Sequence, residues 1–217
     1  MKQIIAIFLS LTLNFMPAIV NADALGLAVQ NIEAQWAHIH YSVAKKQQTA
    51  AYMQLLAEVT ALNAQYPDQA ELIIQQAIII ASNAENVDAF KALEAVHQAR
   101  DLLLRAIELD PNASEGAAYV TLGSLYYMVP SWPIAYGDND KANTMLKKAL
   151  AINPNTIDAN YFYGDFLAKQ GKQQQAVTYF KRAMAIPVRK NQVFADTQLH
   201  RQAKLAIIEN NQFVAAK

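Results

Sequence analysis

The chain contains no cysteine, and this absence excludes several kinds of site at once. Disulfides, thiolate zinc sites, iron–sulfur clusters and a cysteine nucleophile all require that residue. Glycine and proline are also scarce, at 6 and 7 of 217 residues. Because these two residues interrupt helices and alanine favours them, the low glycine and proline content and abundant alanine predict an all-α protein with closely packed helices.

The chain also lacks an excess of charge of either sign. Lys and Arg together number 18, Asp and Glu together number 18, and the formal net charge is zero. Nucleic-acid-binding proteins usually carry a basic surplus, so we expect no nucleic-acid partner. A content of 53% hydrophobic and 17% charged residues can bury a core, which argues against disorder. The length suits one domain of ordinary size.

Long apolar runs are missing except near the N-terminus, where one extends from Ile4 to Leu13. A lysine precedes the run and small residues follow it, an order typical of a secretory signal peptide. We predict a signal peptide over residues 1–22, cleaved after Ala22 or Ala24, and a periplasmic mature protein. The alternative is an uncleaved anchor, although the run is short for a membrane span. No transmembrane segment is expected in the mature chain.

Proline residues mark a repeat along the rest of the chain. Pro67, Pro111, Pro154 and Pro187 each follow a helix-like run, at spacings of 44, 43 and 33 residues. Helical patterns separated by proline at such periods predict stacked helical hairpins, since proline cannot continue a helix. The Asp or Asn after the first three prolines is expected to cap the next helix.

The last two units share a pattern of a large residue, Leu-Gly and Tyr, followed by Ala, a large apolar residue, Ala and Pro, although the later unit has Tyr in place of the Leu and Leu in place of the Tyr. Its residues are Tyr119, Leu122, Gly123, Tyr126, Ala142, Leu146, Ala149 and Pro154, and then Tyr163, Gly164, Leu167, Ala176, Phe180, Ala183 and Pro187. This pattern resembles the tetratricopeptide repeat (TPR). Small residues such as Gly123 and Gly164 are expected where the two helices of a hairpin cross, and Gly171 is expected to form a turn.

The earlier units match the pattern less well but have the same helical layout. Helices are expected at about 25–41, 48–65 and 69–83, and a closing helix at about 193–210. We therefore predict a single TPR-like domain over residues 25–217, an α-solenoid of about four helical hairpins with a C-terminal capping helix.

An insertion of seven residues separates the two helices of the third hairpin, between Val129 and Asp140. It contains two prolines and the aromatic residues Trp132 and Tyr136, which predicts an ordered loop with a function. Packing against the hairpin and binding of a partner are equally open for this aromatic pair. The acidic residues from Asp138 are expected to cap the following helix.

A family resemblance emerges from the insertion and the helix that follows. The matching residues are Val129-Pro130-x-Trp132-Pro133, then Gly137-Asp138, then Asp158-x-Asn160-Tyr161-Phe162-Tyr163-Gly164-Asp165-Phe166. Over residues 116–187 the chain resembles the T component of TRAP (tripartite ATP-independent periplasmic) transporters. The resemblance implies a periplasmic helical protein that binds the transporter's solute-binding protein. Many members carry a lipid anchor on a cysteine, which this chain lacks.

The concave face of such a solenoid is its usual binding surface. By resemblance to the repeat family, its lining would include Val120 and Ser124. The residues that we predict to contact a partner or ligand, on this face and the loop, are Tyr127, Met128, Trp132, Tyr136, Tyr161, Asp165 and Lys169. Two alternatives stay open, a carrier of an apolar small molecule and a general cell-envelope assembly protein. Self-association into a homo-oligomer is also open.

Candidate catalytic and metal-binding groups are few. Glu94, His97 and Asp101 share one helix face, a pattern more typical of a solvated surface than of a metal site. Asp158 and Asp165 also share a face, but no nucleophile accompanies them, and Asp165 is expected to pair with Lys169. We therefore predict a protein that is not an enzyme and needs no metal or cofactor.

Overall fold

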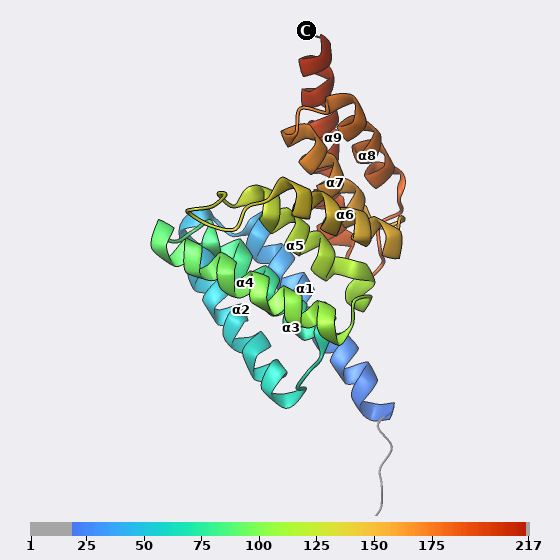
Figure 1. Cartoon of the computed structure of the whole chain (residues 1–217). Coiled ribbons are helices and arrows are strands. Elements are labelled where there is room, and N and C mark those ends of the chain that lie inside the picture. The colour runs from blue at the N-terminus through green and yellow to red at the C-terminus, as the bar shows by residue number, and fades with distance from the viewer. Residues whose placement is uncertain (1–18, 216–217) are drawn as a thin grey trace, which may run out of the picture.

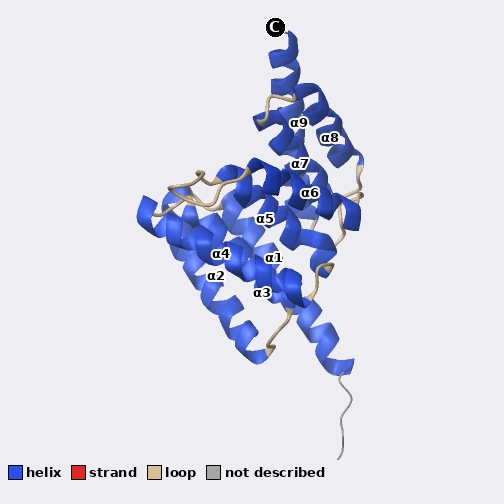
Figure 2. Ribbon diagram, viewed as in Figure 1, coloured by secondary structure: helices blue, strands red, loops and turns tan. Residues whose placement is uncertain are grey.

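The computed structural model describes residues 19–215, and its regular elements are helices (Figures 1 and 2). They are α1 (Ile19–Ser42), α2 (Lys45–Gln65), α3 (Ala70–Ala84), α4 (Ala89–Leu109), the 3₁₀ turn η1 (Ala113–Gly116), α5 (Ala117–Met128), α6 (Asn139–Ile152), α7 (Ile157–Lys169), α8 (Gln173–Ala185) and α9 (Val193–Ala215). The signal-peptide prediction falls mostly on residues 1–18, outside the described residues, and stays a prediction.

The helices pack as sequential pairs, α1 with α2, α3 with α4, α5 with α6 and α7 with α8, and α9 packs on α8. This arrangement confirms the predicted all-α, TPR-like solenoid of four hairpins and a closing helix. The closing helix is longer than expected, because it continues past residue 210 to Ala215. In Figure 1 its last turns extend beyond the rest of the bundle.

Two glycines allow the helices of the third and fourth hairpins to cross closely. A Cβ atom on Gly123 would lie 2.7 Å from Cγ of Leu146, and one on Gly164 would lie 2.8 Å from Cε1 of Phe180. Leu146 and Phe180 are almost fully buried. The predicted role of the small residues is therefore confirmed. Gly171 likewise takes a left-handed conformation, with φ of 74°, in the turn before α8.

The turns that contain proline are capped differently from the prediction. Asn112 and Asn155 do not cap the next helix; instead their backbone N–H groups donate to the side chains of Asp110 and Asn153, at 2.8 and 2.9 Å. Thr156 caps α7 by accepting from the N–H of Ala159. The expectation was therefore wrong at Pro111 and Pro154, because the residue before the proline accepts the hydrogen bond that forms the local turn. It was also wrong at Pro67, where Gln69 is the N-cap of α3.

The first helix of each hairpin and the closing helix form a closed ring. Along the chain, α1 contacts α3, α3 contacts α5, α5 contacts α7, and α7 contacts α9, while α9 also contacts α1. In this fold these helices line the inner face of the superhelix. Contact between the first and last helices therefore closes the ring of helices along the inner face.

The solenoid has two edges of different character. One edge holds the turns within hairpins, including the insertion between α5 and α6. The other holds the turns between hairpins, with Pro67, Pro111, Pro154 and Pro187. In Figure 1 the insertion extends as a long loop over the first turns of α4.

Candidate functional site

The loop that holds the insertion, residues 129–138, is ordered. The N–H of Gly137 donates to the carbonyl of Pro130 at 2.9 Å, and the N–H of Asp138 donates to the carbonyl of Tyr126 at 2.8 Å. A Cβ atom on Gly137 would lie 2.2 Å from the carbonyl oxygen of Val129, so only glycine fits this closure. Asp138 accepts from the N–H groups of Asp140 and Lys141, which confirms the predicted cap of α6.

Tyr136 fastens the loop to α4. Its hydroxyl donates to the carbonyl of Val96 at 2.7 Å. Its ring meets His97 edge-on at 5.1 Å between centroids, and the guanidinium of Arg100 lies 4.7 Å from the ring centroid. Burial raises the pKa of Tyr136 above its usual value, although Arg100 opposes the shift. Of the two alternatives for Tyr136, packing and partner binding, these contacts favour packing.

Trp132 differs from Tyr136, because its side chain is 85% exposed to solvent. Ile134 in the same loop is 65% exposed, and Met128 at the end of α5 is 50% exposed. We call Trp132 and Ile134 the loop tip. A tryptophan held in water by a folded loop leaves a large apolar surface unburied, an arrangement that marks interaction sites more often than chance.

Tyr127, Asp165 and Lys169 lie together on the inner helices α5 and α7. The Tyr127 hydroxyl donates to Oδ2 of Asp165 at 2.7 Å, and Nζ of Lys169 lies 3.2 Å from the same oxygen. The ammonium of Lys169 also lies 4.9 Å from the Tyr127 ring centroid. Burial and the neighbouring Asp165 carboxylate raise the pKa of Tyr127 well above its usual value. The expected pairing of Asp165 with Lys169 is confirmed.

Tyr161 packs into the fourth hairpin, with ring centroids 5.2 Å from Phe162 and 5.6 Å from Phe180. Burial raises its pKa to about 12. Val120 and Ser124, which the repeat resemblance placed along the groove, are buried. The inner face therefore offers fewer free side chains than predicted, because the neighbouring helices already cover them.

A group of polar residues, which we call the clasp, joins the two ends of the solenoid. Arg189 lies 2.9 Å from Oδ2 of Asp158 and 2.5 Å from Oδ1 of Asp196. The side-chain amide of Gln192 donates to Glu33 of α1 at 2.5 Å, and that of Gln75 donates to the same carboxylate at 3.0 Å. The clasp therefore ties α1 and α3 to α7 and α9.

Burial shifts the titration of two clasp carboxylates, Glu33 and Asp158. It raises the pKa of Glu33 and of Asp158, and the nearby Arg189 lowers both only in part. Burial alone would lower the pKa of Arg189, but the Asp196 hydrogen bond and the two other carboxylates hold it above its usual value. Sequence reasoning missed this network, since its members come from four helices and the loop before α9, and no motif joins them.

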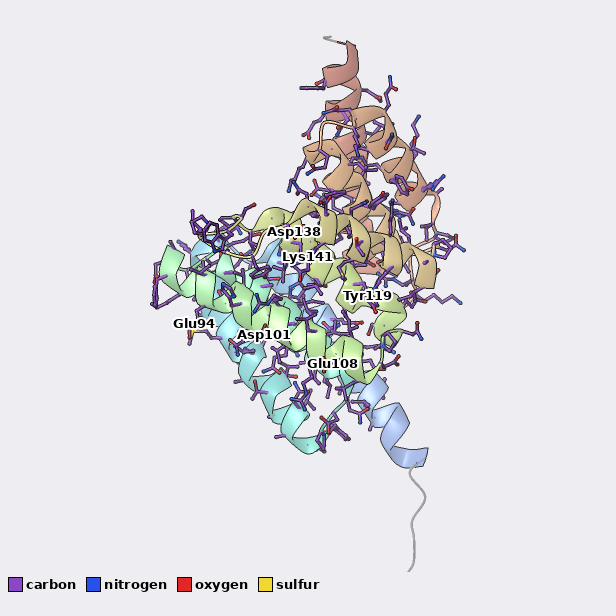
Figure 3. All side chains as sticks on the ribbon, in the orientation of Figure 1. Glu94, Asp101, Glu108, Tyr119, Asp138 and Lys141 are labelled. Carbon is purple, nitrogen blue, oxygen red and sulfur yellow. The ribbon has the colours of Figure 1, made fainter. Side chains whose placement is uncertain are left out.

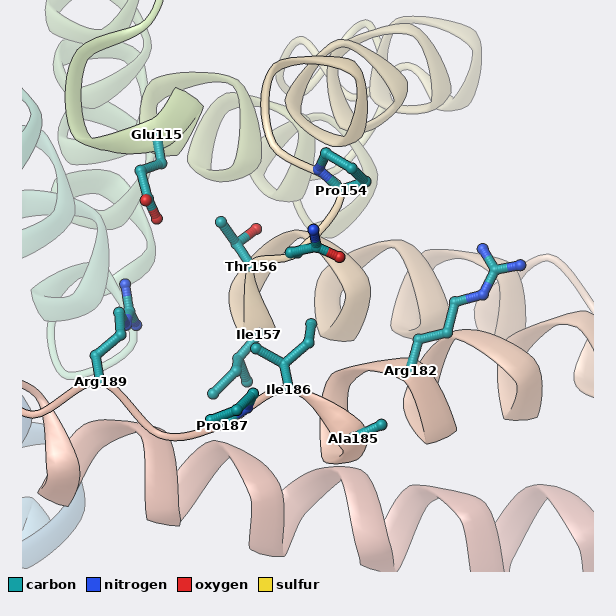
Figure 4. Close-up of a pocket in the computed structure, with 10 residues that line it drawn as sticks. Glu115, Pro154, Thr156, Ile157, Arg182, Ala185, Ile186, Pro187 and Arg189 are labelled. Atoms are coloured by element: carbon teal, nitrogen blue, oxygen red, sulfur yellow. The ribbon is translucent and has the colours of Figure 1, made fainter.

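Two open hollows lie at the edge with the proline turns. The larger, about 720 Å³, is lined by Glu115, Pro154, Asn155, Thr156, Ile157, Arg182, Ala185, Ile186, Pro187 and Arg189 (Figure 4). The smaller, about 490 Å³, is lined by Pro111, Asn112, Tyr119, Lys148, Ala151 and Ile152. Both contain a Pro-Asn turn, an Ala-Ile pair and a cation, so they are equivalent positions of successive repeats.

The carboxylates and histidine considered for chemistry have other roles. His97 packs on Tyr136, and Asp101 pairs with Arg100 at 2.8 Å. Asp158 and Asp165 bind different cations, Arg189 and Lys169. Within residues 19–215 no group of three His, Asp or Glu residues lies close enough to hold a metal ion.

Comparison with known proteins identifies the repeat. Residues 134–188 match the tetratricopeptide repeat family. The crystal structure of TTC0263, a thermophilic TPR protein of Thermus thermophilus, superposes with a TM-score of 0.58 at 18% identity. The alignment covers 87% of this chain and 95% of that one. No curated protein matches the chain.

Two structures of MamA align more loosely. One has a TM-score of 0.44 at 17% identity, over 80% of this chain and 96% of that one. The other, from AMB-1, has a TM-score of 0.46 at 16% identity, over 88% and 98%. At 18% identity, the likeness to TTC0263 concerns the fold alone.

Residues 134–188 therefore match a tetratricopeptide repeat, and the described helices pack in a TPR-like arrangement. Proteins of the TPR family typically have no catalytic activity and bind a protein partner. A search of the described helices found none with the length and apolar content needed to span a membrane.

Proposed function

We propose that this protein is a non-enzymatic periplasmic scaffold that binds a protein partner through the loop tip. The observation that carries the proposal is the contrast within one loop. Tyr136 is fastened to α4, whereas Trp132 is held 85% exposed by backbone hydrogen bonds on either side of it. An aromatic residue that keeps a fixed position before binding loses little conformational entropy when it is buried, so it suits an interface anchor.

The inner face contributes less to this proposal. The contact of α1 with α9 closes it, and the polar groups of Tyr127 and Asp165 already satisfy each other. Met128 and Lys169, at the ends of α5 and α7, keep about half of their side-chain surface exposed. They lie at the same edge as the loop, so a partner at the loop tip could extend its contacts to them.

The partner that we propose is the solute-binding protein of a TRAP-type transporter. The support is the resemblance of residues 116–187 to the transporter's T component, which includes the Val129–Pro133 motif of the loop. This loop is the part of the chain where the family-like motif and the exposed tryptophan coincide. The predicted signal peptide would bring the protein to the same compartment.

Capture with purified and cellular protein tests this proposal. Tagged wild-type protein and the Trp132→Ala/Ile134→Ala variant are used to recover partners from a periplasmic extract, which are identified by mass spectrometry. Wild-type protein should recover a solute-binding protein, and the variant should lose it while its helicity and melting temperature stay unchanged. Met53→Ala on α2, where the side chain is 62% exposed, is the control and should bind normally. Equal capture by the loop variant would contradict the proposal.

Tyr161→Ala is a poor test of binding, although the sequence predicted that Tyr161 contacts a partner or ligand. Tyr161 contacts Phe180, which lies at the crossing of α7 and α8. Removal of its ring would leave a cavity in the core, so a loss of binding could reflect a loss of folding.

A further inference from the structure

The formal net charge of zero conceals an uneven division of charge along the chain. Residues 23–140 hold 14 of the 18 Asp and Glu residues but five of the 18 Lys and Arg residues. Residues 141–217 hold four Asp and Glu residues and twelve Lys and Arg residues. The two parts therefore carry formal charges of −9 and +8. Figure 1 shows α1–α4 towards one end of the molecule and α7–α9 towards the other, with the two parts in contact where α5 pairs with α6 and where α1 meets α9.

Four cations of the basic part occupy equivalent positions of two repeats. Lys147 and Lys148 follow the core residue Leu146 on α6, and Lys181 and Arg182 follow its counterpart Phe180 on α8. All four are exposed, and none forms an ion pair with a carboxylate in the part of the chain that the structure describes. We call these four residues the basic strip.

The two hollows belong to the same strip. Lys148 borders the smaller hollow beside Asn112, and Arg182 borders the larger one beside Asn155. Each cation also lies over a tyrosine ring, at 5.5 Å for Lys148 and 4.9 Å for Arg182. The repeat has therefore produced two copies of a concave surface that combines apolar side chains, an asparagine turn and a cation without a carboxylate partner.

The acidic part carries a matching feature on α4. Glu94, Asp101 and Glu108 are spaced seven residues apart, so they share one face of the helix, and all three are exposed (Figure 3). Asp101 pairs with Arg100, whereas Glu94 and Glu108 form no ion pair among the described residues. We call these three residues the acidic row.

The acidic row and the basic strip lie on outer helices of the same solenoid and do not pair with each other within one molecule. We propose that they pair between molecules, with the acidic row of one copy docked on the basic strip of the next. A second copy of this chain is the proposed occupant, because the chain itself carries both of the complementary charged surfaces. Because two different surfaces meet, the contact is heterologous, and it can continue from copy to copy.

Such a contact is weak and dependent on salt. Single exposed ion pairs contribute little, but complementary fields over a whole face steer and orient two molecules. Neither the acidic row nor the basic strip contains a residue of the loop tip, so this proposal does not rest on it. The two proposals can therefore fail separately.

Sedimentation velocity of the mature chain tests this association. At about 20 mM salt we expect association that increases with protein concentration, and at about 500 mM salt we expect its loss, because the Debye length falls from roughly 20 to about 4 Å. Lys147→Glu/Lys181→Glu and Glu94→Lys/Glu108→Lys should each weaken self-association by about tenfold or more. An equimolar mixture of the two variants should associate again, since each supplies the charge that the other needs.

Lys46→Glu/Lys204→Glu is the control, because it makes the same change in net charge at exposed positions outside the strip. It should associate like the wild-type protein. A monomer at both salt concentrations would overturn the proposal. So would association that survives reversal of the strip, equal loss in the control, or no rescue in the mixture. Binding of the monomer through the strip to vesicles of anionic phospholipid would also overturn it, by showing a lipid occupant instead.

Discussion

The first hairpin and the last two hairpins form the same fold with different interiors. In α5–α8 the helices approach so closely that Gly123 and Gly164 cannot carry a side chain. In α1–α2 the core is filled by large side chains, including Ile32, Tyr52 and Leu55, and Gly26 has nothing within 4 Å of where its Cβ would be. Close crossing restricts the residue types at fixed positions, whereas a core of large side chains can be filled by many combinations of them. The repeat pattern can therefore be recognised in the sequence of α5–α8 but not in that of α1–α2.

Gly164→Val should have the largest effect, since it places a branched side chain where even a Cβ would lie 2.8 Å from the Phe180 ring. The helices α7 and α8 would have to separate, and we expect a loss of about 3 kcal/mol in the free energy of unfolding. Chemical denaturation followed by circular dichroism measures it. A loss near zero would show that the crossing is looser than the structure indicates.

Arg189→Met should have the next largest effect, because it leaves the buried Asp196 without its cation. Since Arg189 is itself about one third exposed, we expect a loss of about 2 kcal/mol, less than for a fully buried pair. Urea denaturation gives the value, and Arg189→Lys should recover part of it. If the methionine variant is as stable as the wild type, the clasp does not hold the two ends together.

His40 should make the first hairpin sensitive to acid. It stacks on Trp36 and lies 3.2 Å from the Tyr52 hydroxyl, and burial lowers its pKa below the usual value. Because the folded state then favours the neutral ring, its contribution to stability is present above about pH 6.5 and is lost as the pH falls. The free energy of unfolding should fall between neutral and mildly acidic pH. This fall should be smaller in His40→Gln than in the wild type, by up to about 1 kcal/mol.

Glu33 and Asp158 act in the opposite direction and must be separated from His40. Burial raises the pKa of both, so the folded state favours their protonated forms and gains relative stability as the pH falls. The comparison of His40→Gln with the wild type cancels this contribution, since both proteins contain the two carboxyl groups. An identical pH dependence in the two proteins would exclude His40 as the acid-sensitive group.

Gly26→Ala should have the smallest effect and the opposite sign. Gly26 lies inside α1, is exposed, and has open space around it. Alanine favours the helix over glycine, so we expect a gain of about 0.5 to 1 kcal/mol. Thermal unfolding measures the gain, and a loss would mean that the first hairpin also depends on a close approach at this position.

The sequence predicted what depends on local chemistry and missed what depends on the path of the chain. Helix pairs, the Asp138 cap and the role of Gly164 follow from propensities and spacing over a few residues. The contact of α1 with α9 depends on the small rotation added by each repeat, and no residue pattern encodes that sum. For this reason the sequence could not predict that Val120 and Ser124, which it placed along the concave face, are buried.

The candidate site was predicted in the same uneven way. The loop was identified because an insertion with Trp132 and Tyr136 interrupts the period. Its pattern could not separate the packed residue from the exposed one, since both are aromatic and four residues apart. What distinguishes Tyr136 from Trp132 is a hydrogen bond to the carbonyl of Val96, which is 40 residues away from Tyr136 in the sequence.

Site-specific photo-cross-linking in intact cells tests the central claim most directly. A photoreactive amino acid is placed at position 132 and, in a matched protein, at the exposed position 53 on α2. The scaffold proposal predicts a cross-link from position 132 to one defined protein, a periplasmic solute-binding protein, and none from position 53. Cross-links of equal yield from both positions, or none from position 132 in folded protein, would contradict it.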